Sequence, residues 1–501
     1  MTVQPIIGRN TGHRTGQGHL ALMKDNPNRM DSQGFVAKGR DKTSQMIKRH
    51  GAFTRKLSLA VVDQGVFAGS NFLINLLLAR WLFPEQYGAF VLAYSWFLLA
   101  QNIYDAIIIE PMVVNGAGKY ADRLRSYFGF VFRHQIWVSL VFAVFLFLGG
   151  LAAYVFDSDL VGSAVIATAF MSPLLITRWL TRQPFYIVSQ PRNAVIGGIL
   201  YLVLSIVGIA VLHTFPVIEQ VPFGFTTLEQ VRQGGFWWAE ATILNPVTTT
   251  LVMGAASLIA AVIVTVFFIK PDFNLKASSL NTREIVSAHW AYGRWASVER
   301  ILAWIPSNIY YIVLPTIAGL AVSGGLRALS NLTMPVYMAM TSMYGIIFPS
   351  FVRTYTQGGL DALSKRVRVT IILMMTMTGI YCVILTLFGT QISNLLFAGK
   401  YDYLTNTAVM FTLGLGPVIS AFTGAIDAGL RAMGLVKYTF VAKVLPTALT
   451  MTVGLFLAAQ FGILGANIGF IVTSLVHTAV LFFVVKRTRR NEQDSGAEAE
   501  G

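Results

Sequence analysis

The chain has 501 residues, of which 54% are hydrophobic and only 12% are charged, and its mean hydropathy is +0.60. Soluble proteins carry about 25% charged residues, so this composition excludes an ordinary soluble protein. It predicts a membrane protein with roughly 12 helices of about 20 residues each. The net charge of +15 does not require a nucleic-acid partner, because lysines and arginines between membrane spans orient the chain. With one cysteine, Cys382, neither a disulfide framework nor a cysteine metal cluster is available.

Apolar runs bounded by charge, proline or glycine predict twelve spans, six in each half of the chain. In chain order the spans are 57–78, 88–111, 129–155, 160–181, 194–213, 248–269, 294–318, 328–350, 367–390, 405–427, 438–459 and 463–485. The predicted fold is an all-α polytopic membrane protein with two six-helix bundles around a central cavity. A shift of 237 residues places Ser70-Asn71 on Ser307-Asn308, which predicts that the halves are repeats, as in many transporters.

The spans divide the chain into five parts. We expect a disordered basic cytosolic tail at 1–56, a first bundle at 57–269, a cytosolic linker with an amphipathic elbow at 270–293, a second bundle at 294–485 and a disordered cytosolic tail at 486–501.

The positive charges predict the orientation of the chain. With the N-terminus in the cytosol, 30 of the 38 lysines and arginines fall in the two tails and the loops on the same side, whereas four fall in the opposite loops. By the positive-inside rule both termini are cytosolic. Trp237-Trp238, in the longest outside loop, is expected to be an interfacial anchor, with a platform for sugar stacking as the alternative.

Charged residues inside spans cost roughly 2.5–3.5 kcal/mol each at mid-bilayer, so they need a partner or a water-filled cavity. Nine such residues all fall toward the cytosolic ends of their spans: Asp63, Asp105, Glu110, Arg133, Arg294, Glu299, Arg300, Asp427 and Lys443. A cavity that is basic only at its cytosolic end suits an anionic headgroup loaded from the cytosol, with arginine donating to phosphate oxygens.

Candidate functional residues follow from this pattern, and no catalytic residue, metal or cofactor is expected. Asp63, Glu299 and Asp105 are candidates for a gate or for ion coupling. The substrate-binding candidates are the bases Arg294, Arg300, Arg133 and Lys443 and the neutral groups Asn71, Asn75, Asn308 and Tyr311, whose amides and aromatic ring suit sugars.

Simpler interpretations remain open for the same residues. The charges of the first and seventh spans could merely pair with one another, Arg133 and Lys443 could extend to the inner surface, and Glu110 and Asp427 could be structural. A third interpretation is that Asp63 and Arg300, which match under the 237-residue shift, pair to close a cytosolic gate when the cavity faces outward.

Three stretches resemble one known family. Leu78 to Gly88 (LARWLFPEQYG) is similar to the first-loop motif of polysaccharide flippases in the multidrug/oligosaccharidyl-lipid/polysaccharide exporter superfamily. Arg178 to Ala194 resembles that family's basic loop between spans four and five, and Tyr292-Gly293-Arg294-Trp295 through Pro335 resembles the opening of its second half.

The resemblance covers about 57–485 and implies flipping of an undecaprenyl-diphosphate-linked oligosaccharide from the cytosolic to the outer leaflet by alternating access. Its setting would be exopolysaccharide or O-antigen biosynthesis at the bacterial cytoplasmic (inner) membrane, with membrane lipid and other polysaccharide assembly proteins as partners. Arg294 and Arg300 match the family's basic cavity residues, which hold the diphosphate. The lipid II branch has an adjacent Arg-Asp pair in span one, where this chain has Asp63-Gln64, so lipid II is not the expected substrate.

Two other functions stay open. A cation-coupled drug or small-molecule antiporter of the same fold would use Asp63, Asp105 and Glu299 as proton or sodium sites. A membrane polysaccharide polymerase or glycosyltransferase is disfavoured, because loop 214–247 contains no paired-carboxylate motif.

Overall fold

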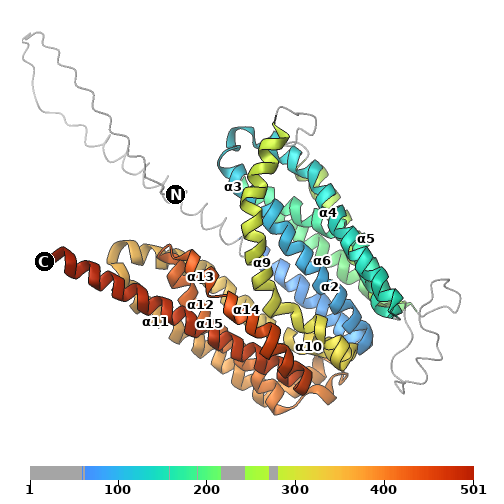
Figure 1. The fold of residues 1–501 in the computed structure, drawn as a ribbon. Coiled ribbons are helices and arrows are strands. Elements are labelled where there is room, and N and C mark those ends of the chain that lie inside the picture. The colour runs from blue at the N-terminus through green and yellow to red at the C-terminus, as the bar shows by residue number, and fades with distance from the viewer. Residues whose placement is uncertain are drawn as a thin grey trace, which may run out of the picture. The chain divides into compact units, whose positions relative to one another are not determined.

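The structure is a computed structural model that describes Leu59 and residues 62–156, 158–188, 190–215, 243–269 and 280–500 (Figure 1). The predicted N-terminal tail at 1–56, the Trp237-Trp238 pair and the start of the linker lie outside the described residues.

The described chain is built from helices. After a first span, Val62–Trp81, the first half contains α2 (Pro84–Tyr104), the π-helix η1 (Asp105–Ile109), α3 (Glu110–Ala117), η2 (Ala121–Arg123), α4 (Leu124–Val155), α5 (Asp159–Ile187), α6 (Pro191–Thr214), α8 (Pro246–Val264) and the π-helix η3 (Thr265–Ile269). The second half contains α9 (Thr282–Ala318), α10 (Leu320–Asn331), α11 (Met334–Phe397), η5 (Asp402–Leu404), α12 (Thr407–Ala432), α13 (Val436–Val441), α14 (Val444–Leu449), the π-helix η6 (Thr450–Gly454) and α15 (Leu455–Glu500).

Ten helices within the described residues are long and apolar enough to cross a membrane. The longest, α11, has 64 residues and is interrupted at Gly359, whose φ is 64°. Met340 and Met374 lie on opposite sides of this glycine and pack in one buried cluster with Ala421. In a straight helix they would be about 50 Å apart, so the chain reverses at Gly359 and α11 is two spans.

The last of the ten, Lys437–Thr488, reverses in the same way. Gly462 has a φ of 58°, a conformation that glycine adopts without strain. A Cβ on Gly469 would lie 2.9 Å from the Cα of Gly454, so the segments on both sides of Gly462 pack together. Division of both helices at their glycines gives the twelve spans that the sequence predicts.

The helices form two bundles. In the first half α4 packs on α5, α5 on α8, α6 on α8 and α2 on α5, and in the second half α11 packs on α12 and α12 on α15. The two bundles meet where α2 packs against α9 and α10, as Figure 1 shows for these three helices. The all-α fold with two bundles therefore agrees with the sequence prediction.

The contact between α2 and α10 depends on glycine. A Cβ on Gly88 would lie 1.9 Å from the carbonyl oxygen of Leu320, and one on Gly324 would lie 2.7 Å from that of Pro84. Both distances are too short for any side chain, so the two backbones touch here. We call this end of the helices the Arg80 end, after the last turn of the first span, and the opposite end the Asp63 end.

The predicted elbow is not a separate element. Residues 282–318 form the single helix α9, because no proline interrupts the sequence between Thr282 and Pro306. Its first turns are attached to the first bundle: the carboxylate of Glu284 lies 2.7 Å from Lys119 Nζ, and His289 Nδ1 lies 3.0 Å from the carbonyl oxygen of Ile107. The beginning of α9 therefore belongs to the first bundle.

Two other boundaries differ from the sequence prediction. The eighth span, predicted to begin at 328, is preceded by the short helix α10, which starts after Gly319 with a φ of 90°. The tail at 486–501 is predicted to be disordered, whereas α15 continues to Glu500. Its many helix-forming Glu, Gln, Arg and Ala residues are compatible with a helix.

Candidate functional site

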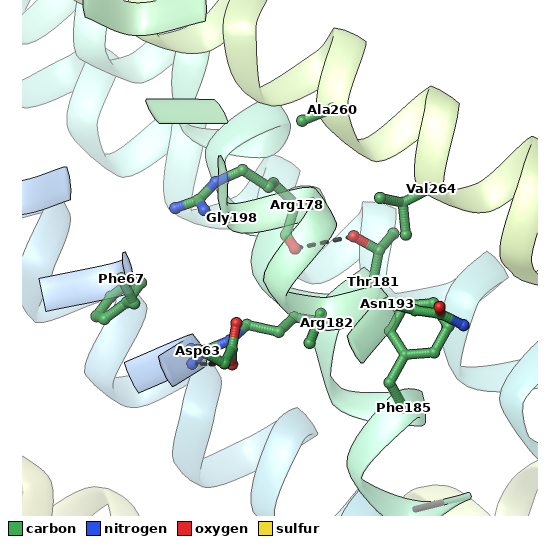
Figure 2. Close-up of a pocket in the computed structure, with 12 residues that line it drawn as sticks. Asp63, Phe67, Arg178, Thr181, Arg182, Phe185, Asn193, Gly198, Ala260 and Val264 are labelled. Atoms are coloured by element: carbon green, nitrogen blue, oxygen red, sulfur yellow. Dashed lines mark hydrogen bonds and ion pairs between the residues drawn. The ribbon is translucent and has the colours of Figure 1, made fainter. Parts of the chain in front are cut away.

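A pocket inside the first bundle is lined by the first span, α5, α6 and α8 (Figure 2). It is small, with a cavity volume of about 20 Å³, and the wider empty space of about 370 Å³ includes open solvent. Its charged groups are Asp63, Arg178 and Arg182. Arg178 and Arg182 are four residues apart on α5, so they lie on one face of the helix.

Asp63 is 1% exposed and forms an ion pair inside this pocket. Its Oδ2 lies 2.5 Å from Arg182 Nη2 and accepts a hydrogen bond of 2.7 Å from Arg182 Nε. The hydroxyl of Tyr186 donates to the same oxygen. The other oxygen, Oδ1, is buried and has no hydrogen-bond partner in the described part of the chain. A Cβ on Gly198 would lie 3.7 Å from it, so a small residue of α6 leaves this oxygen room.

Two further arginines lie deep in the protein among tyrosines. The guanidinium of Arg178 lies 3.8 Å from the centre of the Tyr201 ring, and that of Arg327 lies 5.4 Å from the Tyr311 ring. Tyr94 interacts electrostatically with both arginines. Arg178 belongs to the first half and Arg327 to α10 of the second, so this basic and aromatic cluster spans the contact between the bundles.

Neutral polar groups continue the contact toward the Arg80 end. Asn75 Nδ2 donates to Asn71 Oδ1 at 2.8 Å, and the Tyr87 hydroxyl donates to Asn75 Oδ1 at 3.1 Å. Asn331 Nδ2 in turn donates to the Tyr87 hydroxyl at 3.4 Å. The hydroxyl of Tyr311 donates to Ser330. The structure therefore brings the predicted residues Asn71, Asn75 and Tyr311 to the region between the halves.

Asn308 differs from these three. Its side chain is 9% exposed and donates to the carbonyl of Trp304 within its own helix, so its amide is engaged locally.

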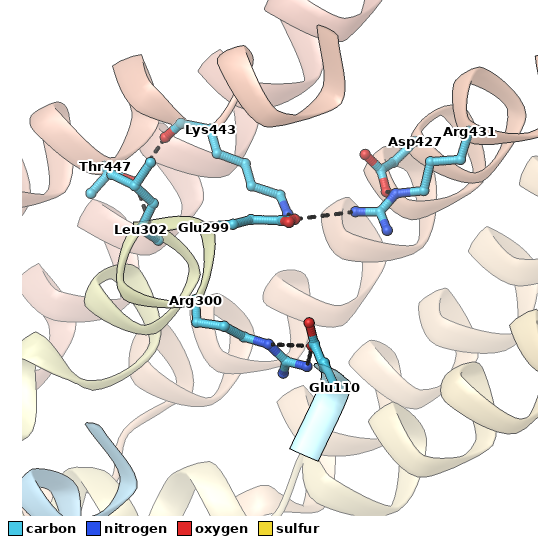
Figure 3. A network of polar contacts seen from close by, with 8 residues as sticks. All are labelled: Glu110, Glu299, Arg300, Leu302, Asp427, Arg431, Lys443 and Thr447. Atoms are coloured by element: carbon cyan, nitrogen blue, oxygen red, sulfur yellow. Dashed lines mark hydrogen bonds and ion pairs between the residues drawn. The ribbon is translucent and has the colours of Figure 1, made fainter. Parts of the chain in front are cut away.

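The predicted charges of the second half form ion pairs (Figure 3). Arg300 pairs with Glu110 of α3. Lys443 Nζ lies 2.9 Å from Glu299 Oε1, and the same carboxylate lies 4.0 Å from Arg431 Nη2. Arg431 Nε lies 2.7 Å from Asp427 Oδ2. These side chains are partly exposed, and every predicted base in the group has a carboxylate partner.

Asp63 and Arg300, which were hypothesised to pair when the cavity faces outward, have other partners in this structure. Asp63 pairs with Arg182 and Arg300 pairs with Glu110. The physical reason is that α5 lies against the first span on the inside of the first bundle and presents Arg182 there, whereas α9 presents Arg300 to α3.

Three predicted residues lie apart from these pairs. Arg294 is exposed, with its guanidinium 5.6 Å from the Trp295 ring, and Arg133 is exposed on α4. Asp105 accepts a 2.6 Å hydrogen bond from Trp179 Nε1. The structure does not bring Arg294 and Arg133 to the buried pocket or to the basic and aromatic cluster.

The sequence interpretation missed three arginines that line the pocket or the basic and aromatic cluster. Arg178, Arg182 and Arg327 were assigned to loops and counted only for topology, yet all three lie inside the fold. A signal was available: Arg178 falls within the predicted span 160–181, and Arg178, Arg182 and Tyr186 repeat every fourth residue. This spacing places three polar side chains on one helical face.

Comparison with known proteins identifies the fold. No protein-family model matches the chain, and no curated protein matches it. Among solved structures, the chain is similar to an inward-facing multidrug resistance MATE family transporter of the MOP superfamily, at 15% identity over 86% of this chain and 99% of that chain, with a TM-score of 0.66.

Two further solved structures show the same fold. The outward-facing multidrug resistance MATE family transporter of the MOP superfamily has a TM-score of 0.57, 15% identity and coverage of 88% and 96% of the two chains. A MOP superfamily transporter from Pyrococcus furiosus, described by the reverse polarity of its binding pocket, has a TM-score of 0.54, 15% identity and coverage of 87% and 95%. The chain is a multi-pass membrane protein with the fold of these transporters, and these neighbours are transporters rather than enzymes.

Proposed function

We propose that this chain is a cation-coupled antiporter that works by alternating access, with Asp63 as the group that binds the coupling ion. The observation that carries the proposal is the burial of the Asp63 carboxylate beside a pocket, with one of its oxygens unpartnered in the described structure. An ionisable group at this depth is costly, and such groups mark ion and substrate paths. The multidrug transporters of the same fold support an antiporter more than the flippase predicted from the sequence motifs.

The ion pair suggests how binding of an ion is linked to movement. A proton or sodium ion that binds Asp63 competes with Arg182 for the negative charge, so binding weakens the contact between the first span and α5. An ion can bias a conformational equilibrium only through such differential contacts. Asp63→Asn, which keeps the shape of the side chain but removes its charge, mimics the proton-bound form.

Transport by purified protein in liposomes tests this proposal. We expect a pH gradient to drive accumulation of ethidium, a cationic drug probe, in liposomes with the parent protein, and Asp63→Asn to abolish the dependence on the gradient. Asp361→Asn, at an exposed residue of α11, is the matched control. Gradient-driven accumulation that persists in Asp63→Asn would remove Asp63 from the coupling role.

A second candidate is the flipping of a polyprenyl-diphosphate-linked oligosaccharide, which the basic and aromatic cluster favours. Arg178 and Arg327 supply two guanidinium groups, each against a tyrosine ring, on the two sides of the contact between the bundles. Guanidinium groups suit phosphate oxygens, whereas they would repel a cationic drug. One transporter of this fold is described by the reverse polarity of its binding pocket and a suggested different function, so the fold does not by itself require a cationic drug as the substrate.

This candidate is tested with a fluorescent polyprenyl-diphosphate oligosaccharide in liposomes, where a membrane-impermeant lectin detects the sugar that reaches the outer leaflet. Arg178→Gln and Arg327→Gln should each slow the appearance of sugar at least tenfold, because each removes a charged hydrogen-bond donor to phosphate worth roughly 1.5–3 kcal/mol. Arg353→Gln, at an exposed position of α11, is the control. Unchanged flipping in both variants would remove the two arginines from phosphate binding. Absence of flipping by the parent protein, with transport of ethidium retained, would reject the flippase in favour of the antiporter.

The proposed location is the bacterial cytoplasmic membrane, with both termini in the cytosol and polysaccharide assembly proteins as partners of a flippase. The charge bias of the loops supports the orientation. Protease accessibility of tags at the two ends in spheroplasts tests it, because cytosolic tags are protected.

A further inference from the structure

At the Arg80 end, side chains of each half donate hydrogen bonds to backbone carbonyls of the other half. The two segments involved are more than 300 residues apart in sequence. One segment is the end of the first span with the start of the loop after it, and the other is the end of α11 with the loop that follows. Arg80 lies in the LARWLFPEQYG motif, and Lys400 lies in the sequence Gly399-Lys400-Tyr401. Neither residue takes part in the proposed ion site.

The last carbonyls of α11 show why Arg80 is needed. The final four carbonyl groups of a helix have no partner within the helix. The N–H of Gly399 donates to Asn394, and that of Lys400 donates to Phe397. The two carbonyls between them, of Leu395 and Leu396, accept hydrogen bonds of 2.8 and 3.1 Å from Arg80 Nη1. A side chain of the first half therefore completes the cap of a helix in the second.

At the end of the first span, side chains of the second half donate hydrogen bonds to carbonyls of the first half. The N–H of Leu82 donates to Leu78 within the chain segment itself. The carbonyl of Ala79 accepts a 3.3 Å hydrogen bond from the Tyr401 hydroxyl, and that of Leu82 accepts one of 2.9 Å from Lys400 Nζ.

Both cations also lie at helix C-termini, where the partial negative charge of the helix favours them. Each half therefore caps a helix of the other, and we call this contact the reciprocal cap.

The reciprocal cap lies at the same end as the closest approach of the two bundles. The backbones of α2 and α10 touch at Gly88 and Gly324, and the first span, whose end the cap holds, is followed directly by α2. Lys400 is 7% exposed, whereas Arg80 is exposed, so only the Lys400 part of the contact is shielded from water. The groups that the cap satisfies are backbone carbonyls, and separation of the halves at this end would leave them without these protein partners.

We propose that Arg80 and Lys400 form a gate, in which the reciprocal cap holds the Arg80 end of the protein closed and breaks when that end opens during transport. The proposal uses the alternating access of the proposed function but neither its ion nor its substrate. A gate made of side chains and carbonyls breaks without leaving a buried unpaired carboxylate, so it can open and close repeatedly.

Distances between spin labels test the gate independently of any substrate. The parent carries Cys382→Ser, which removes the only cysteine. Labels at Asp159→Cys and Thr407→Cys, exposed residues at the starts of α5 and α12, report on the Arg80 end. Labels at Asp122→Cys and Asp361→Cys, also exposed, report on the Asp63 end. The protein is measured in lipid nanodiscs.

The gate predicts opposite changes at the two ends. Arg80→Ala and Lys400→Ala should each shift the ratio of closed to open protein about tenfold, and the double variant about a hundredfold, because they cap two different helices. The distance at the Arg80 end lengthens while that at the Asp63 end shortens. Arg80→Lys should recover part of the closed population, since lysine also donates to carbonyls.

A purely structural role gives a different result. If the reciprocal cap only stabilises the fold, the variants broaden both distances or change neither, and the proposal is overturned. Arg353→Ala, which removes an exposed arginine elsewhere on α11, is the matched control and should leave both distances unchanged. If the double variant does not fold, Tyr401→Phe and Arg80→Gln remove fewer donors and should produce smaller shifts in the same directions. An unchanged distribution in both of them also rejects the gate.

Discussion

Replacement of Arg182 by leucine should destabilise the protein much more than replacement of Arg182 and Asp63 together. The two side chains are 8% and 1% exposed, and two nitrogens of Arg182 approach one oxygen of Asp63 at 2.5 and 2.7 Å. Arg182→Leu leaves the Asp63 carboxylate buried without its cation, which costs about 3–5 kcal/mol. With Asp63→Asn added, no charge is stranded, and the remaining loss is about 1 kcal/mol of hydrogen bonding.

The single cysteine makes this difference measurable. Cys382 is 7% exposed, so a dye that fluoresces on reaction with thiols reports the unfolding of its surroundings on heating. An unfolding entropy of about 2.1 cal/mol/K per residue gives roughly 1 °C per kcal/mol for a chain of this length. The expected decrease in Tm is therefore about 3–5 °C for Arg182→Leu and about 1 °C for the double variant. Equal decreases in both would refute the conclusion that the pair compensates a buried charge.

Three further predictions concern other contacts. Gly88→Ala should shift the spin-label distances toward an open Arg80 end, because the new methyl group has no room between α2 and α10. Gly69→Ala, which has no atom within 4 Å of the new Cβ, should leave the distances unchanged. Equal effects of the two variants would remove the α2–α10 contact from the gate. Burial lowers the pKa of Lys400 to about 8 from its ordinary 10.5, so the closed state binds a proton less tightly than an open state with Lys400 in water. The ratio of closed to open protein should be constant below about pH 8 and rise by up to about tenfold per pH unit between pH 8 and 10.5. Lys400→Met should abolish this rise. A ratio that falls over this pH range would contradict the argument. Glu299→Gln should lower the free energy of unfolding by less than about 1 kcal/mol, because the pair of Glu299 with Lys443 is partly exposed. A decrease in Tm above 3 °C would show that the pair is effectively buried.

The spans and their number were predictable because a bilayer demands long apolar helices. The reversals at Gly359 and Gly462 also follow from sequence features, since charge or small residues interrupt the apolar runs near both positions. The continuity of α9 was not predictable from hydropathy, because its first turns are amphipathic and become part of the helix through packing on α3 and η1. An amphipathic segment has the same pattern whether it lies on a membrane or against a protein surface.

The partners of the buried charges were less predictable than their positions. Asp63 was recognised as costly, yet its partner Arg182 was assigned to a loop because the predicted span ended at 181. In the structure α5 continues to Ile187, and one additional helical turn moves Arg182 from solvent into the bundle. Ion pairs between distant segments depend on which helices are neighbours and on their rotation, and neither quantity is contained in the hydropathy of one segment.

The unbroken helix α9 links the two bundles mechanically. Its first turns are held by the first bundle through His289 and Glu284, whereas farther along it packs against α10 and α15 of the second. Any change in the angle between the bundles must therefore bend this helix. Pro306 interrupts its hydrogen-bond ladder between the two attachments and lowers the stiffness there, so the same rod that joins the bundles also provides a flexible joint for their rotation.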